Sequence, residues 1–194
     1  MHAETGSRLL FPGLLIAMPD AAPDAAGRFL DTLFLSGGLV LSQVTRLTGL
    51  AGHEVQNWVS RKFLPPPVHR TYNRSQFCRI VLINHLRESL KIETIATLLE
   101  HINGHLDDTS DDLVDDARLY NYYVNLRMRL SDGIPAEDAL RKIILDVVKD
   151  YRETVKGSKN RLADVLTVMA YAGQAAALQK RCVDCMESWK TDRI

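Results

Sequence analysis

Polar side chains of the kinds that read DNA bases cluster between residues 53 and 61. The amides of Gln56 and Asn57 can pair with adenine, and the guanidinium of Arg61 can pair with guanine or with a phosphate. His53 stands near the start of the same segment, where it could contact a phosphate. An ordinary solvated helix face would explain any one of these residues equally well, so the interpretation depends on the elements around them.

The chain around these residues predicts a helix-turn-helix. Ser42 is a suitable N-cap for a short helix, Gly49 supplies a tight turn, and a second helix is predicted over residues 52–62. Trp58 belongs to the apolar stripe of the second helix, so we expect it to anchor that helix in the core. The polar side chains then face outward, where the major groove of a duplex would meet them.

A proline-rich strip after the second helix predicts a wing. Residues 65–67 are all proline and force an extended path. Arg70 and Tyr72 stand at its end, where they would reach a phosphate or the minor groove. The other cations that could flank the phosphate backbone are Lys62, Arg74 and Arg79. The predicted DNA contacts are His53, Gln56, Asn57, Ser60, Arg61, Lys62, Arg70, Tyr72 and Arg74.

The formal net charge of the 194 residues is zero, but the charges are unevenly distributed. Residues 41–79 carry six Lys or Arg against Glu54 alone, a net charge of +5, whereas residues 107–116 carry six aspartates. The neutral total therefore hides a basic module followed by an acidic linker. The aspartates lack the glycine and glutamate spacing of an EF-hand loop, so we interpret them as a solvated linker or a helix start.

The remaining pattern predicts an all-α fold with a minimal β wing. Asn73 and Gln76 form a capping box at the start of the helix that follows the wing. Other helices are predicted over 24–36, from 92 to 103, and over 112–131, 135–156 (with Pro135 in the first turn) and 158–190. The predicted divisions are an N-terminal strip and scaffold helix (1–38), a winged helix-turn-helix (39–104), an acidic linker (105–111) and a helical domain (112–194).

Other classes of function have little support in the sequence. The apolar run 9–18 contains Pro12 and Gly13 and is too short to cross a membrane, and three cysteines favour a reducing compartment, so we expect a cytoplasmic protein. Cys182 and Cys185 have the spacing of half a zinc site that a dimer could complete, but ordinary surface cysteines fit as well. We find no catalytic motif, and expect no enzyme activity, no cofactor and no metal.

Two strings separated by Val68 and His69, TGLAGHEVQNWVSRKFLPPP and RTYNRSQFCRIVLINHLRESLKIETIATLL, resemble the DNA-binding domain of MerR-type transcriptional regulators. A closer similarity is to an uncharacterised bacterial family of MerR-like proteins with a Gln-Asn-Trp-Val recognition helix and an all-helical second half. The resemblance implies occupation or distortion of promoter DNA. Gln56 stands where the broad family usually has arginine, and residues 68–71 contain no glycine for a hairpin tip, so neither contact is carried over.

The predicted function is a transcriptional regulator that binds a near-palindromic site in double-stranded DNA as a homodimer. One recognition helix makes too few base contacts for selectivity, and two-fold symmetry doubles them. Dimerisation is predicted through the helix 158–190 or the helix 112–131. The sequence leaves open whether the protein also binds an unknown small-molecule effector. The alternative is a protein-interaction or small-molecule-sensing helical module whose winged helix no longer binds DNA.

Overall fold

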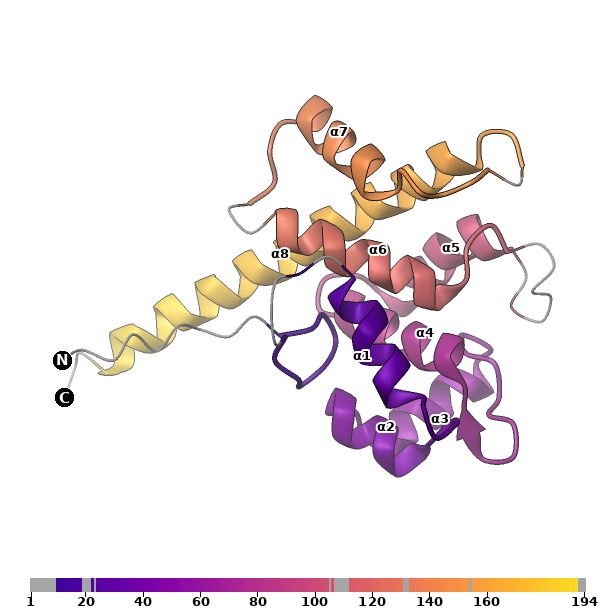
Figure 1. The fold of residues 1–194 in the computed structure, drawn as a ribbon. Helices are drawn as coiled ribbons and strands as arrows, with labels where there is room; N and C mark the ends of the chain where they lie inside the picture. The colour runs from indigo at the N-terminus through magenta and orange to yellow at the C-terminus, as the bar shows by residue number, and fades with distance from the viewer. Residues whose placement is uncertain are drawn as a thin grey trace.

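The structure, a computed structural model, describes residues 10–18, 22, 24–104, 106, 112–130, 133–153 and 155–191. This part of the chain forms eight helices and one two-stranded sheet (Figure 1), which confirms the all-α fold with a minimal β wing. The helices are α1 (Ala25–Leu33), α2 (Leu41–Thr48), α3 (Gly52–Ser60), α4 (Arg74–Leu86), α5 (Ile92–Asn103), α6 (Asp116–Arg129), α7 (Glu137–Val147) and α8 (Ser158–Thr191). The strands are β1 (Leu39–Val40) and β2 (Thr71–Tyr72).

Helices α2 and α3 form the predicted helix-turn-helix. Gly49 ends α2 with a φ of 77°, a left-handed conformation that glycine adopts without strain. The predicted N-cap at Ser42 is wrong, because Ser42 lies inside α2. The helix begins at Leu41, where the side chain of Gln43 accepts a hydrogen bond of 2.9 Å from the backbone N–H of Val40.

The wing is a narrow antiparallel ladder that joins the chain before α2 to the chain before α4. Leu39 pairs with Tyr72 and Val40 pairs with Thr71. The predicted capping box then begins α4, since Asn73 accepts from the N–H of Gln76 at 2.8 Å and the Gln76 side chain accepts from the N–H of Asn73 at 2.9 Å.

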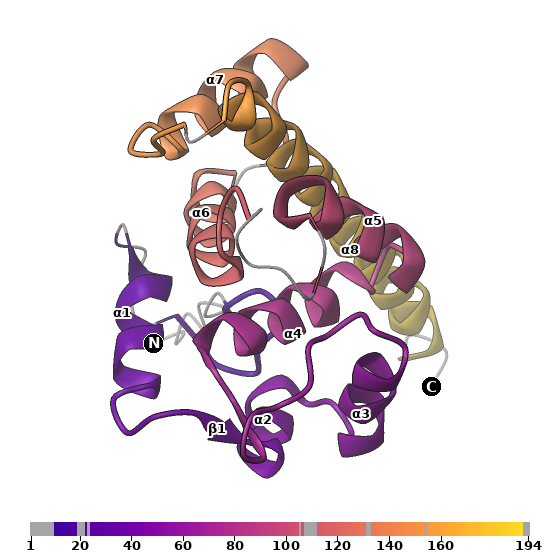
Figure 2. The same cartoon turned by 90° about the vertical axis from the view of Figure 1, so that its right-hand side faces the viewer.

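One hydrophobic core runs through both halves of the chain. It extends from Phe11 in the N-terminal loop to Ala172 in α8. Helix α4 lies near its centre and is buried on all sides between 76 and 83, while α6 packs against α1 and α4 (Figure 2). Helix α8 in turn packs against α5 and α7. The predicted linker, 105–111, lies outside the described residues except for Leu106, and the helices on its two sides share this core.

Several helices are shorter than predicted, because tertiary contacts take over their ends. Helix α1 ends at Leu33 and not at 36. Helix α6 begins at Asp116, since the carboxylate of Asp115 caps it by accepting from two backbone N–H groups at 2.9 and 3.0 Å. Helix α7 begins after Pro135, at Glu137, so the proline is outside its first turn.

The end of α7 shows the largest departure from the prediction. The helix stops at Val147 instead of 156. The chain turns there and buries Val148 and Tyr151, and the Tyr151 hydroxyl donates a hydrogen bond of 3.0 Å to the backbone oxygen of Leu113. Burial of an aromatic ring outweighs the few helical hydrogen bonds that a longer α7 would add.

Helix α8 is 34 residues long, and its second half extends beyond the body of the molecule (Figure 1). Residues 178–189 are exposed on all sides. Within the described residues, no helix combines the length and the apolar character needed to cross a bilayer.

Candidate nucleic-acid interface

The outer face of α3 carries the predicted reading residues. His53, Gln56, Asn57 and Ser60 are all exposed. Trp58, on the opposite face, is 5% exposed and lies in the core, as predicted. The amides of Gln56 and Asn57 make no hydrogen bond with another described residue, so both are available to base edges.

Contacts from α4 fix the orientation of α3. The carboxylate of Glu54 accepts from the backbone N–H of Ala51 at 2.8 Å and from the guanidinium of Arg87 at 2.6 Å. The Arg87 hydrogen bond is the main reason that the pKa of Glu54 is lowered. The Arg87 guanidinium also lies 5.7 Å from the centre of the Trp58 ring, a cation–π arrangement. The Glu54–Arg87 ion pair and the contact of Arg87 with Trp58 therefore hold α3 with its polar face outward.

Lys62 is held in a conformation that lysine rarely adopts. Its φ is 58°, and it ends α3 in a Schellman motif, where Lys62 N–H donates to Val59 O at 3.0 Å and Phe63 N–H donates to Trp58 O at 2.9 Å. Glycine is the usual residue at this position. The motif places the ammonium-bearing side chain in solvent at the end of the recognition helix.

The tip of the wing is a two-residue hairpin without glycine. Val68 and Thr71 exchange backbone hydrogen bonds of 3.0 and 2.9 Å, and His69 and Arg70 between them have φ of 49° and 64°. Two consecutive positive φ values are the mark of a type I′ turn, which Asn-Gly favours. Non-glycine residues in this region cost about 1–3 kcal/mol each and concentrate at functional sites.

A hollow of about 440 Å³ joins the recognition helix to the wing. Gln56 and Ser60 of α3 line one side, and Arg70 of the wing lines the other. The other residues that line it are Leu41, Val59, Pro67 and Tyr72. The structure thus brings together side chains that are fourteen positions apart, and none of the residues lining the hollow is acidic.

Three of the predicted cations have acidic partners. Arg61 donates to Glu93 at 2.7 Å, yet its side chain stays half-exposed, so a phosphate could displace this surface pair. Arg74 is paired with Asp31 across α1 and α4. Arg79 is buried and bonded to Asp116 at 2.7 Å, so its predicted backbone contact is wrong.

The predicted DNA contact of Tyr72 is also wrong. Its side chain is only 3% exposed, because β2 turns it inward opposite Leu39 and against the core. Burial raises the pKa of its hydroxyl. Tyr72 forms part of the floor of the hollow, whereas Arg70 at the hairpin tip is exposed.

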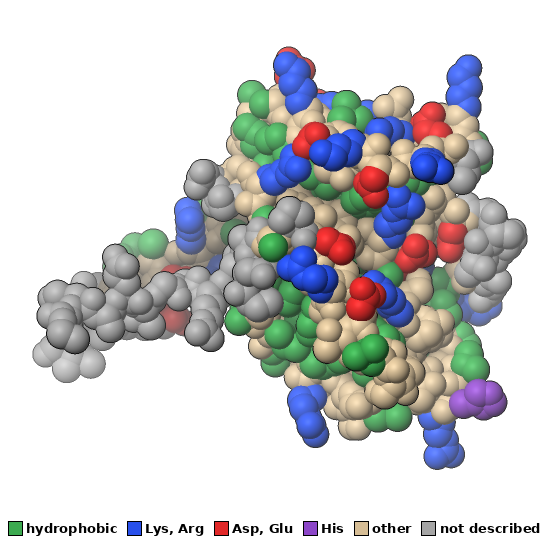
Figure 3. All heavy atoms as spheres, viewed as in Figure 1, with side chains coloured by type: hydrophobic (Ala, Val, Ile, Leu, Met, Phe, Trp, Pro, Cys, Tyr) green, Lys and Arg blue, Asp and Glu red, His purple; other side chains and the backbone are tan. Residues whose placement is uncertain are grey.

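The helical second half leaves the face of α3 open. Helix α7 lies at the other end of the molecule, α6 lies between α7 and α4, and the projecting part of α8 points away from α3 (Figures 1 and 2). In the view of Figure 3, the lower end of the molecule, built by α2, α3 and the wing, shows Lys or Arg and His side chains without an Asp or Glu between them.

The sequence interpretation missed His69. A histidine between a valine and an arginine carries no helix or strand signal, and the absence of glycine argued against a hairpin tip. The available signal was the length of the segment, since only two residues separate Val68 from Thr71.

Comparison with known protein families gives a match over part of the chain. Residues 33–123 match the profile of a family described as Domain of unknown function (DUF1836). The matched stretch contains the helix-turn-helix, the wing, α4, α5 and the first part of α6. It therefore crosses the predicted domain boundary at 104, in keeping with the shared core. Neither the curated proteins nor the solved structures contain a match to this chain.

Proposed function

We propose that the protein is a cytoplasmic, sequence-specific regulator that binds double-stranded DNA as a homodimer. Helix α3 would lie in the major groove, where Gln56 and Asn57 reach base edges. The wing tip would lie along the neighbouring backbone, with Arg70 at a phosphate. Lys62 and Arg61 would add contacts at the end of the recognition helix.

The proposal depends on one observation: exposed polar residues of α3 and the strained wing tip lie around the same hollow. Amide and hydroxyl groups of α3 face Arg70 of a hairpin whose two tip residues are held at positive φ. A wing that served only to close the fold would gain stability from Asn-Gly at the tip. A costly backbone conformation at the wing tip is explained if it presents the Arg70 cation to an anion such as the phosphate backbone.

A seam along α8 supports the homodimer. Seven exposed residues follow one another at alternating spacings of three and four, which is the heptad pattern of a two-stranded coiled coil. They are Val168, Tyr171, Ala175, Leu178, Cys182, Cys185 and Trp189, and we refer to them as the α8 seam. All seven are apolar or weakly polar, and four of them are large hydrophobic side chains between 41% and 62% exposed.

A second copy of the chain is the occupant that this seam fits. From Leu178 to Trp189 the register runs along the free end of α8, where the described residues provide no covering element, whereas Val168 lines a hollow beside α5. The same stripe on a second copy presents the same register, as a two-fold interface requires. The dimer would present two recognition helices to a near-palindromic site.

The decisive experiment is selection of bound sequences from a random pool of duplex DNA with the full chain. We expect enrichment of a near-palindromic site, whose half-sites would lie about 10 base pairs apart or a multiple of that spacing. A pool that stays random after several rounds would contradict the proposal and favour a winged helix that binds a protein instead.

A further inference from the structure

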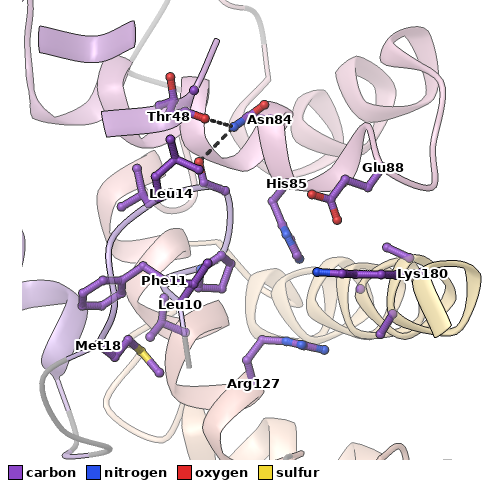
Figure 4. Close-up of a pocket in the computed structure, with 18 residues that line it drawn as sticks. Leu10, Phe11, Leu14, Met18, Thr48, Asn84, His85, Glu88, Arg127 and Lys180 are labelled. Atoms are coloured by element: carbon purple, nitrogen blue, oxygen red, sulfur yellow. Dashed lines mark hydrogen bonds between the residues drawn. The ribbon is translucent and has the colours of Figure 1, made fainter. Parts of the chain in front are cut away.

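A second cavity, of about 510 Å³, lies between the N-terminal loop and helices α4, α6 and α8 (Figure 4). Its walls come from the N-terminal loop 10–18, the ends of α2 and α4, and the facing sides of α6 and α8. The volume is in the range of pockets that hold small organic ligands. We call it the loop cavity.

One part of the loop cavity is apolar. The residues that form this part are Leu10, Phe11, Leu14, Met18 and Val124. Phe11 and Leu14 are almost wholly buried, whereas Leu10 is half-exposed at the rim. An apolar wall of this size would take a hydrocarbon or aromatic group out of water.

The other part of the loop cavity carries an excess of positive charge. Arg127 of α6 and Lys180 of α8 approach it from two sides, and Glu88 is the acidic residue that lines it (Figure 4). Among the described residues, neither cation has a salt-bridge or hydrogen-bond partner. A guanidinium that is not paired with a protein carboxylate can bind a carboxylate ligand through two charge-assisted hydrogen bonds.

His85 lies between these charges and is neutral at physiological pH. Burial, together with the charge of Arg127, lowers its pKa to about 4. The Tyr123 hydroxyl donates to the backbone oxygen of Met169 at 3.2 Å, so it accepts from Nε2–H of His85 at 2.8 Å. The histidine therefore adds a fixed polar group to the cavity without adding charge.

Gly173 leaves the space that this cluster needs. A Cβ atom there would lie 2.5 Å from the Tyr123 hydroxyl and 3.3 Å from an Arg127 guanidinium nitrogen. Gly173 and Lys180 lie on the side of α8 opposite the α8 seam, so a dimer formed through the seam leaves the loop cavity open.

The N-terminal loop that forms the apolar wall is tied to its surroundings by three hydrogen bonds. The Leu15 N–H donates to Leu47 O at 2.9 Å, the Asn84 side chain donates to Gly13 O at 2.9 Å, and the Tyr120 hydroxyl donates to Pro12 O at 2.9 Å. The same Asn84 amide donates to Thr48 O at 3.0 Å (Figure 4). These hydrogen bonds therefore hold the apolar wall in place against the end of α2.

We propose that the loop cavity binds a small organic anion in which a carboxylate is joined to an apolar body. The carboxylate would lie between Arg127 and Lys180, and the apolar body would pack on Phe11, Leu14 and Met18. This site is separate from the DNA interface, and its occupation is measured without DNA. Failure of one proposal therefore leaves the other standing.

The test is calorimetric titration of the full chain at pH 7.5 with two probe carboxylates, decanoate and 2-naphthoate. Each is compared with its neutral amide, which has the same body without the charge. We expect at least one carboxylate to bind about tenfold more tightly than its amide, the effect of one charge-assisted hydrogen bond. Equal affinity for acid and amide, or no binding of either carboxylate at millimolar concentration, would overturn the proposal.

Four variants locate the binding site. Arg127→Gln is expected to weaken carboxylate binding about tenfold, and Lys180→Gln about threefold, because the lysine is more exposed. Glu88→Gln is expected to strengthen binding, since it removes the opposing charge. Arg181→Gln is the matched control: it is adjacent to Lys180 in α8 but does not line the cavity, and it should leave affinity unchanged.

Lys180→Gln keeps the test decisive if Arg127→Gln does not fold, because the Lys180 side chain projects from the exposed side of α8. Binding that responds equally to Lys180→Gln and Arg181→Gln would show attraction to the general charge of α8, and would contradict the assigned site.

Discussion

Asn57 and Trp58 are neighbours in the sequence but point to opposite sides of α3. The exposed amide is placed to read a base, and the buried indole holds the helix to the core. Asn57→Ala is expected to relax sequence preference by about 1–3 kcal/mol at one base pair while leaving the melting temperature nearly unchanged. Trp58→Ala is expected to lower the free energy of unfolding by about 3–5 kcal/mol.

Urea unfolding and repeated DNA selection measure both changes. A loss of stability in both variants, without a change of selectivity in Asn57→Ala, would show that the outer face of α3 does not read bases.

At the hairpin tip, one double replacement is expected to raise the stability of the fold and to weaken DNA binding. Replacement of His69 and Arg70 by Asn and Gly relieves two positive-φ residues, and we expect it to stabilise the fold by about 1–2 kcal/mol. The same change removes one predicted phosphate contact per subunit. The slope of log K against log salt concentration should then become less steep by about 2 for a dimer.

His69→Asn alone is the matched control for the hairpin. It relieves part of the strain and keeps the Arg70 cation, so stability should rise while the salt slope stays the same. A double replacement that stabilises the fold and leaves the slope unchanged would remove Arg70 from the interface.

His85 predicts a loss of stability in mild acid. Its folded-state pKa of about 4 lies below the ordinary value of 6.5, so the folded chain binds fewer protons than the unfolded chain between these values. The stabilisation is present above pH 6.5 and is lost as pH falls. Between pH 6.5 and 5 we expect a decrease of about 2 kcal/mol in the free energy of unfolding.

The window from pH 6.5 to 5 lies above the ordinary pKa values of exposed carboxylates, so most of them stay charged while the histidine of the unfolded chain takes up a proton. His85→Gln is the comparison, because its amide can still donate to the Tyr123 hydroxyl. Urea unfolding at several pH values should show a flatter profile in this variant. An identical decline in both proteins would assign the effect to other groups.

At the scale of helices and strands, local signals predicted the winged helix-turn-helix well. Gly49, the Asn73–Gln76 capping box and the inward Trp58 are specified by neighbouring residues, and the structure confirms all three. Features that depend on distant partners were not predictable in this way. Tyr72 is buried because β2 pairs with a strand over thirty positions earlier, and α7 stops early because Tyr151 packs elsewhere.

The candidate sites follow the same division. The exposed polar face of α3 could be predicted from helical periodicity, because the relevant residues are all in one helix. The loop cavity could not, since Arg127, Lys180 and Phe11 come from three segments that only the folded core brings together.

Asp116 shows how a residue in an acidic run can belong to the core. It is fully buried, and burial raises its pKa although the Arg79 charge opposes the rise. The pair joins α4 to α6, on the two sides of the predicted linker. Arg79→Met is expected to destabilise the protein by about 3–5 kcal/mol, because it leaves a buried carboxylate without its partner.

The double variant Arg79→Met, Asp116→Leu should regain at least half of that loss, since the unpaired charge is gone. Urea unfolding of the three proteins tests this, and a single cooperative transition is expected in each. A small effect of Arg79→Met, with two separate transitions, would instead support independent domains on the two sides of residues 105–111.

At the scale of the whole molecule, the proposed dimer would combine the α8 seam and helix α3 in one assembly. Two copies joined through α8 would double the DNA contacts, and the charges of the basic module would then act on one duplex. The chain mass is 21.8 kDa, so light scattering after size exclusion should give twice this value. Leu178→Glu places a charge in the seam and is expected to reduce the mass to that of one chain.

The salt dependence of DNA binding tests the proposed dimer and the proposed DNA interface together. About four phosphate contacts per subunit predict a slope of log K against log salt near −7 for the dimer, and about −3.5 for the Leu178→Glu monomer. Gln179→Glu is the matched control, since it adds the same charge one position outside the seam and should leave both the mass and the slope unchanged. Because the Leu178 side chain is exposed, the melting temperature of the body should also stay the same. A monomer that retains the full slope would show that one copy contacts all the phosphates, and the two-fold arrangement would be wrong.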